Sequence, residues 1–285
     1  MLQPRGVLQY LLMLNLLLTL SPAPELVFRM VTTSFIVIAV ALAVGRFGPL
    51  IGGAIAGLPI VLGPGFYFLI ARAPTNFVSE AAAYSVLSLC ATQVFTFAYI
   101  ATAANRSPLL AIAIATCSWF ISVSVLRLLP PDPWLAIALF ILFTAIARKG
   151  AAHFRRDAIK IKRSENLSLL LLRGGLAGIL VAVVTASANH LGTDWSGLLL
   201  AYPVGYTVIA VTIHRQFGSN ILIATLTSTL LGTGSLAAFC ASLSLALRVL
   251  PPYTAFISAL AISFAVTTGL VVFNRLKQAR SASLS

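Results

Sequence analysis

The sequence predicts an all-α fold: a polytopic transmembrane helical bundle of about nine or ten spans, arranged as two four-helix repeats of inverted topology. Of its 285 residues, 59% are hydrophobic and only 9% are charged. Uncharged stretches of about 20 residues recur along the chain, which is the length that crosses the hydrocarbon core of a bilayer. These stretches are continuously apolar, whereas the strands of a membrane barrel alternate at period two, so helices are expected.

The predicted spans follow one another with little polar sequence between them. The breaks carry turn residues, such as Asn105-Arg106-Ser107-Pro108, Pro130-Pro131-Asp132-Pro133 and Pro251-Pro252. In chain order the spans are expected at about 24–45, 49–71, 81–104, 107–126, 133–147, 167–189, 195–213, 218–246 and 252–273.

The N-terminal segment 1–23 is hydrophobic and has more than one interpretation. Arg5 precedes a short apolar run that ends in small residues, which is typical of a signal peptide. The same segment could form an extra span, or could precede a true start at Met30. An extra hydrophobic segment or a misplaced start is favoured over cleavage.

The net charge of +13 is distributed in a way that predicts topology rather than nucleic-acid binding. Seven of the 19 basic residues lie between Arg148 and Arg163, and the others stand singly near segment ends. This is the positive-inside pattern of an inner (plasma) membrane protein. The linker 148–165 and the C-terminus are therefore expected in the cytoplasm, the bilayer is the expected partner, and no nucleic acid is expected.

The basic linker has a second, weaker interpretation. Phe154, Ala158 and Ile161 share one helical face, and basic residues occupy the remainder. Such a segment would lie on anionic lipids, either as a plain topology determinant or as a lipid sensor.

A hidden repeat appears when the chain is shifted by 144 residues. Helix breakers and loop residues then coincide without a gap: Gly53 with Gly197, Pro59 with Pro203, Asn76 with Asn220, Phe95 with Phe239, and Pro108 with Pro252. An odd number of spans separates the starts of the two units, so the second unit enters the membrane from the opposite side. The predicted organisation is a leader or span at 1–23, repeat unit 1 at 24–127, a connecting span at 128–148, the linker at 149–166, repeat unit 2 at 167–275 and a tail at 276–285.

Each unit resembles the small, four-span GlpM-like bacterial inner-membrane proteins. The residues that carry the resemblance are "AGLPIVLGPGFYFLIARA" (56–73) and "RSPLLAIAIATCSWFISVSVL" (106–126). The second half keeps "WSGLLLAYPV" (195–204) but has Ser263 opposite Trp119. The resemblance implies a bacterial, duplicated and fused membrane unit, and it brings no assigned reaction.

Two spans at corresponding positions contain proline and glycine, which weaken helices. Proline frees a backbone carbonyl, and such a break is tolerated only against protein or a water-filled cavity. Paired broken spans in inverted halves indicate a transporter's central site. Packing of small residues, as in Gly53-x-x-x-Gly57, is the alternative explanation. The candidate substrate-binding residues in these spans are Gly57, Pro59, Gly63, Pro64, Tyr202, Pro203, Gly205 and Tyr206.

Two further polar residues complete the candidate site. Arg173 lies within an apolar run, so it either faces a substrate or snorkels to the interface. Gln93 is a candidate because a buried amide needs several hydrogen bonds. The six acidic residues all stand at or near span boundaries. A proton-coupled cation transporter normally needs a carboxylate at depth, so that function is disfavoured.

The sequence therefore favours a permease or flippase for a small neutral, anionic or lipid-like substrate. A non-transporting scaffold or accessory subunit in envelope assembly is the alternative, and further copies of the chain are left open as partners. An enzyme is disfavoured because neither paired carboxylates nor a His-x-x-Glu-His pattern occurs. Cys90, Cys117 and Cys240 form no Cys-x-x-Cys pair and are expected to be small core residues. No catalytic residue, metal or cofactor is predicted.

Overall fold

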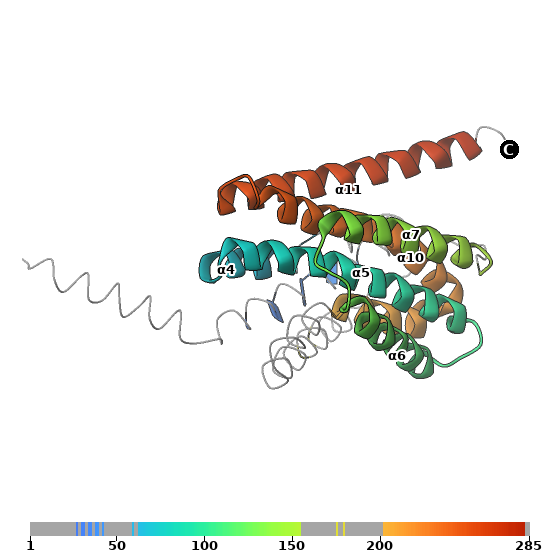
Figure 1. Cartoon of the computed structure of the whole chain (residues 1–285). Helices are drawn as coiled ribbons and strands as arrows, with labels where there is room; N and C mark the ends of the chain where they lie inside the picture. The colour runs from blue at the N-terminus through green and yellow to red at the C-terminus, as the bar shows by residue number, and fades with distance from the viewer. Residues whose placement is uncertain are drawn as a thin grey trace, which may run out of the picture.

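The computed structural model describes residues 62–154 and 202–282, together with scattered positions: eight between Val27 and Leu42, and Pro59, Gly175 and Ile179. In this part of the chain all regular structure is α-helical, which confirms the predicted class (Figure 1). Five of its helices are long and apolar enough to cross a membrane, as a multi-pass membrane protein requires. The helices are α4 (Leu62–Arg72), α5 (Thr75–Ala103), α6 (Pro108–Leu126), α7 (Pro133–Ala152), α10 (Val204–Ala246) and α11 (Pro252–Ala282).

The predicted turn motifs fix where α6 and α7 begin. Ser107 caps α6, because its side chain accepts a hydrogen bond from the Leu110 amide at 3.4 Å. Asp132 caps α7 in the same way through the Leu135 amide at 2.8 Å. In both helices proline occupies the first turn, where its missing N–H has no partner to lose.

Several helices extend beyond the predicted spans. Helix α5 begins at Thr75 rather than 81, α7 continues past 147 to Ala152, and α11 continues past 273 to Ala282. Helical backbone thus includes the start of the predicted linker and most of the predicted tail. The reason is that hydropathy detects only the apolar part of a helix, whereas alanine, lysine, arginine and glutamine continue a helix into the polar zone.

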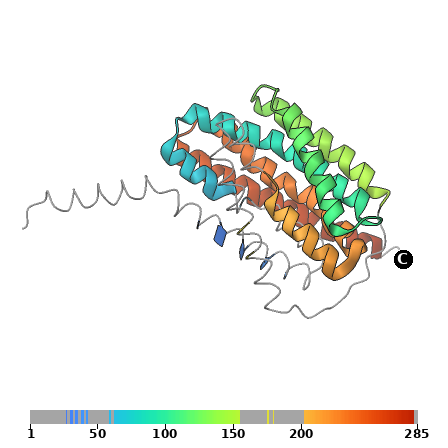
Figure 2. The same cartoon turned by 90° about the horizontal axis from the view of Figure 1, so that it is seen from below.

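The two spans predicted at 195–213 and 218–246 are joined in one element, α10. Gly218 interrupts it, with φ 81° and ψ 175°, a conformation essentially reserved for glycine. We call residues 204–217 the first part of α10 and residues 219–246 the second part. Figure 2 shows the first, lighter orange part set at an angle to the remainder.

Helix α5 and the second part of α10 form the centre of the bundle and run antiparallel. Ser79 Oγ, early in α5, donates to the carbonyl of Ser244, late in α10, at 2.9 Å. Gln93, further along α5, contacts Thr233, which comes earlier in α10. Most of both helices is buried, whereas α6, α7 and α11 flank them with largely exposed apolar faces. Such apolar outer faces match a lipid environment.

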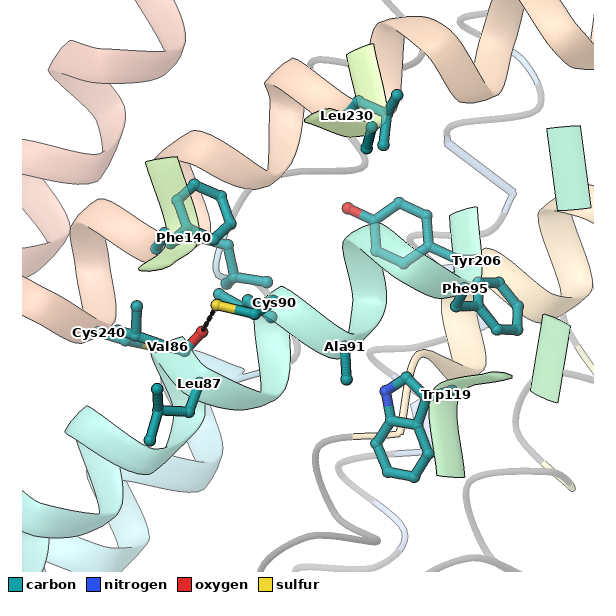
Figure 3. Packing of buried hydrophobic residues seen from close by; sticks show 14 of the residues in the cluster. Val86, Leu87, Cys90, Ala91, Phe95, Trp119, Phe140, Tyr206, Leu230 and Cys240 are labelled. Carbon is teal, nitrogen blue, oxygen red and sulfur yellow. Dashed lines mark hydrogen bonds between the residues drawn. The ribbon is translucent and has the colours of Figure 1, made fainter. Parts of the chain in front are cut away.

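The core around α5 contains both large and small side chains. Figure 3 shows Leu87, Cys90 and Phe95 of α5 among Trp119 of α6 and Phe140 of α7. Alanine and glycine let neighbouring helices approach closely, as is common within membranes.

The cysteines follow the expectation of small core residues in part. Cys90 and Cys240 are buried and free, whereas Cys117 is exposed on α6. The prediction was therefore wrong for Cys117. Hydropathy cannot tell a core-facing residue from one on the outer face of a membrane helix, because both faces are apolar.

Candidate functional site

The structure places most of the candidate residues and leaves two unplaced. Gly57 and Arg173 lie outside the described residues. Gln93 is in α5. The others lie at the starts of two helices: Pro59, Gly63 and Pro64 at α4, and Tyr202, Pro203, Gly205 and Tyr206 at α10.

Helix α4 begins directly after a turn that contains Pro59. The Pro59 carbonyl accepts a hydrogen bond from the Gly63 amide at 2.7 Å, which closes the first helical turn. Pro64 falls in the first turn of α4, where proline is tolerated. A methyl group added at Gly63 would meet Leu260 Cδ2 only at 3.9 Å, an ordinary contact. Close helix packing therefore does not explain this glycine.

Helix α10 begins in a comparable way after Pro203. Pro203 takes the N-cap position without a side-chain cap, and its carbonyl accepts from the Thr207 amide at 2.9 Å. A methyl group added at Gly205 would meet no atom within 4 Å. In both spans a described helix thus starts just after the proline, and the part of each span that precedes the proline lies outside the described residues, except for Tyr202.

Tyr202 is the centre of a polar and aromatic cluster at the start of α10. Its hydroxyl lies 2.8 Å from Thr116 Oγ1 and 3.1 Å from Thr207 Oγ1. The rings of Trp119 and Phe95 meet its ring nearly edge-on, at centroid distances of 5.2 and 6.3 Å. Helices α5 and α6 therefore hold the first turn of α10.

Helix α4 has its aromatic contacts in the other half of the chain. Phe66 meets Phe239 of α10 edge-on at 6.0 Å between ring centroids. Tyr67 lies 6.0 Å from Tyr253 and 5.9 Å from Phe256, both in α11. Helix α4 and the start of α10, which both follow a proline, thus each contact helices from the other half of the chain. We call this arrangement crosswise packing.

Gln93 occupies a fully buried position where α5, α7 and α10 meet. Its Nε2 lies 2.8 Å from Thr144 Oγ1, 2.7 Å from Thr233 Oγ1 and 3.2 Å from the Leu230 carbonyl. Its Oε1 is buried and has no hydrogen-bond partner. Leaving a buried acceptor unpaired costs about 1–3 kcal/mol, so the position calls for an explanation. We call Gln93, Thr144, Leu230 and Thr233 the amide node.

Two other buried threonine hydroxyls are satisfied within their own helices. Thr92 donates to the Ser88 carbonyl at 3.2 Å, and Thr229 donates to the Leu226 carbonyl at 2.7 Å. Ser88 Oγ and Trp119 Nε1, by contrast, are buried without a hydrogen-bond partner. These threonine hydroxyls are therefore satisfied by their own backbone, and the unpaired groups lie elsewhere.

The interior of the described helices carries hydroxyl and amide groups but no buried charged side chain. Groups of His, Cys, Asp and Glu that could hold a metal ion do not occur among these residues. A ligand that entered here would meet neutral hydrogen-bonding groups.

Sequence reasoning missed Thr116 and Thr144 as partners of the candidate residues. Each is a single hydroxyl in an apolar run, and such a residue normally bonds to its own helix. Trp119 was noted only for the family resemblance. The one signal in the sequence was Gln93 itself, because an amide in an apolar span needs hydrogen-bond partners from other helices.

Comparison of the chain with protein-family models, with curated proteins and with solved structures finds no match. Function is therefore inferred from the geometry of the chain itself.

Proposed function

We propose that the protein is a permease or flippase of the bacterial inner membrane, which moves a small neutral, anionic or lipid-like substrate by alternating access between inverted repeats. The observation that carries this proposal is the pair of helices that begin after Pro59 and Pro203 and pack crosswise. Paired discontinuous helices are the usual site of substrate binding in transporters of this architecture.

The positions of the helices support the inverted repeat. Helices α6 and α11 begin at Pro108 and Pro252, which coincide under the 144-residue shift. Thr75, where α5 starts, coincides with Ser219, where the second part of α10 starts after Gly218. Corresponding helices that run antiparallel, as α5 and the second part of α10 do, are what opposite membrane orientation requires.

The crosswise packing suggests how the halves would move. The first N–H groups of a helix lack partners within that helix, and they carry partial positive charge. Rocking one half against the other would shift each of these helix starts relative to the half that holds it. The proposal includes no chemical step, so the substrate crosses unchanged, without a cofactor or catalytic residue.

The rest of the architecture follows as part of the same proposal. The chain would have about nine or ten spans, with the basic linker on anionic lipids and both the linker and the C-terminus in the cytoplasm. Kinship with the GlpM-like proteins, as a duplicated and fused unit, remains a proposal that rests on the motifs quoted above.

A scaffold or accessory subunit in envelope assembly is the second candidate. Its support is the extent of exposed apolar surface on α6, α7 and α11, which offers room for helical partners, including further copies of the chain. Residues Ile121, Trp134 and Ile257 are about two-thirds exposed on these three helices (68%, 65% and 64%).

Flux through reconstituted protein distinguishes the two candidates. Proteoliposomes would be assayed for scrambling of labelled phospholipid and for uptake of labelled polyols, amino acids and organic anions. We expect flux of at least one substrate, reduced about tenfold or more by Pro59→Ala and by Pro203→Ala, because a continuous helix disfavours one of the two states. Pro133→Ala, in the first turn of α7, is the matched control and should keep its flux.

The opposite outcome is equally concrete. A full panel without flux, together with a protein that co-purifies in stoichiometric amount, would replace transport with the scaffold function. If flux is unchanged by both proline substitutions, the protein transports a substrate but the helices that begin after Pro59 and Pro203 are not needed for it.

A further inference from the structure

One end of the described bundle collects exposed basic side chains from separate elements. The ends of α5 and α7 lie together there, because the Phe97 ring meets the Phe154 ring edge-on at 6.4 Å. The exposed basic residues at this end follow α5, lie near the end of α7, or lie near the end of the first part of α10: Arg106, Arg148, Lys149 and Arg215. We call it the basic end of the bundle.

The opposite end carries charges of both signs. Glu80 lies near the start of α5, and Asp132 caps the start of α7. Arg127 and Arg248 follow the ends of α6 and α10, at this same end. Among the described residues the basic end therefore has no acidic side chain to balance it, and its charge suits an anionic partner.

Hydrogen bonds join the connection 104–107 to the first part of α10 at the basic end. The Tyr99 hydroxyl donates to the Pro108 carbonyl at 3.4 Å and lies 3.3 Å from His214 Nδ1. The His214 ring also hydrogen-bonds to the backbone of Ala103, directly before the connection. These contacts hold the two segments side by side.

The two segments each present an arginine beside exposed apolar side chains. Arg106 lies in the connection, and Arg215 is close enough to the Tyr99 hydroxyl to act on it electrostatically. Leu109 and Leu110, in the first turn of α6, are 62% and 44% exposed. Positive charge and an apolar surface thus adjoin each other, which is the combination that a phospholipid headgroup and its acyl chain require.

We propose that Arg106 and Arg215 bind the phosphate of an anionic phospholipid, whose acyl chains lie along Leu109 and Leu110. The arginine guanidinium matches the geometry of phosphate oxygens. A free phosphate ion would gain nothing from the two leucines, whereas an acyl chain buries apolar surface against them. The site is separate from the basic linker 149–166.

The position of the site gives the lipid a mechanical role. Arg215 comes three residues before Gly218, where α10 is interrupted, and Arg106 directly follows α5. A headgroup between the two arginines would hold the end of the first part of α10 against the end of α5. An effect of the lipid on transport rests on the proposed function, whereas the binding of the lipid does not.

Thermal unfolding of the purified full-length chain in detergent tests the site without any flux measurement. Phosphatidylglycerol would be titrated into the sample, and phosphatidylcholine into a parallel one. We expect the melting temperature to rise saturably with phosphatidylglycerol alone, because a ligand that binds only the folded state stabilises it. Replacing both Arg106→Gln and Arg215→Gln should raise the half-saturating lipid concentration about tenfold or more, since each basic residue near the headgroups adds to the attraction.

A matched pair of substitutions locates the effect. Arg127→Gln with Arg248→Gln removes the same charge from the opposite end and should leave the lipid-dependent shift unchanged. Equal shifts with both lipids would overturn the proposal. A wild-type response of the Arg106→Gln, Arg215→Gln chain would also overturn it, because the lipid would then bind elsewhere, for example at the linker. A shift of the same size with inorganic phosphate and no lipid would replace the lipid site with a site for a free anion.

Discussion

Gly150 determines how closely α7 approaches α5. A methyl group at this position would lie 2.6 Å from Cε2 of Phe97, closer than real contacts allow. The Phe97 ring also meets Phe154 edge-on at 6.4 Å, so a second residue from this end of α7 contacts it. At the scale of single residues, the contact between these helices therefore depends on the absence of one side chain.

Gly150→Ala should destabilise the fold by about 1–3 kcal/mol, because the Phe97 ring would have to move. The measurement is thermal unfolding in detergent. Gly269→Ala in α11 is the matched control: no atom lies within 4 Å of the added methyl group, so its melting temperature should be unchanged or higher. Equal melting of the two variants would show that α7 does not pack on Phe97 in this way.

Single residues also show where sequence reasoning reached its limit. The need of Gln93 for buried partners followed from its chemistry alone, and the structure buries it fully. Its partners Thr144 and Thr233 lie 51 and 140 positions away in the chain. No local pattern connects such residues, so only the packing of three helices could name them.

Among the elements, α10 depends most on a single backbone conformation. The φ of 81° and ψ of 175° at Gly218 separate its two parts. This conformation lets the first part return to Tyr99, where His214 Nδ1 lies 3.3 Å from the tyrosine hydroxyl. Side chains with a Cβ avoid this region of backbone space at a cost of about 1–3 kcal/mol.

Gly218→Ala should therefore lower the melting temperature, and Gly218→Asn should not rescue it. Asparagine tolerates the left-handed helical region, but that region has a ψ near +47°, far from the ψ of 175° found here. Gly205→Ala in the same helix has open space around it and serves as the control. Normal stability of Gly218→Ala would mean that the two parts of α10 form one continuous helix.

The starts of α6 and α7 were predictable because specific residues enforce them. Ser107 and Asp132 cap α6 and α7 beside the prolines that marked the turns in the sequence. The far ends of α7 and α11 were not predictable from apolar runs, because polar residues continue a helix as well as apolar ones do.

At the scale of the whole molecule, the antiparallel centre makes a prediction about sidedness. The segment 104–107 follows the end of α5, and 247–251 follows the end of α10. Because α5 and the second part of α10 run in opposite directions, these two connections should lie on opposite faces of the membrane.

Cysteine labelling tests this arrangement. Asn105→Cys and Val249→Cys would be placed singly in a chain that lacks Cys90, Cys117 and Cys240. Under the proposed topology, in which the basic residues after α7 lie in the cytoplasm, an impermeant maleimide should label Val249→Cys in right-side-out vesicles. Asn105→Cys should react only in inside-out vesicles, and labelling of both positions from one side would contradict the antiparallel centre.

The sequence alone determined that this chain is helical, that its helices suit a membrane, and that prolines precede the starts of α4 and α10. These properties depend on composition and on local backbone chemistry, which the order of residues contains directly. The tertiary structure alone decided that α4 and the start of α10 each contact helices of the other half of the chain, and that Gln93 meets Thr144 and Thr233. In an apolar bundle every helix face is hydrophobic, so hydropathy cannot select neighbours, and the choice falls to side-chain shape and hydrogen bonding.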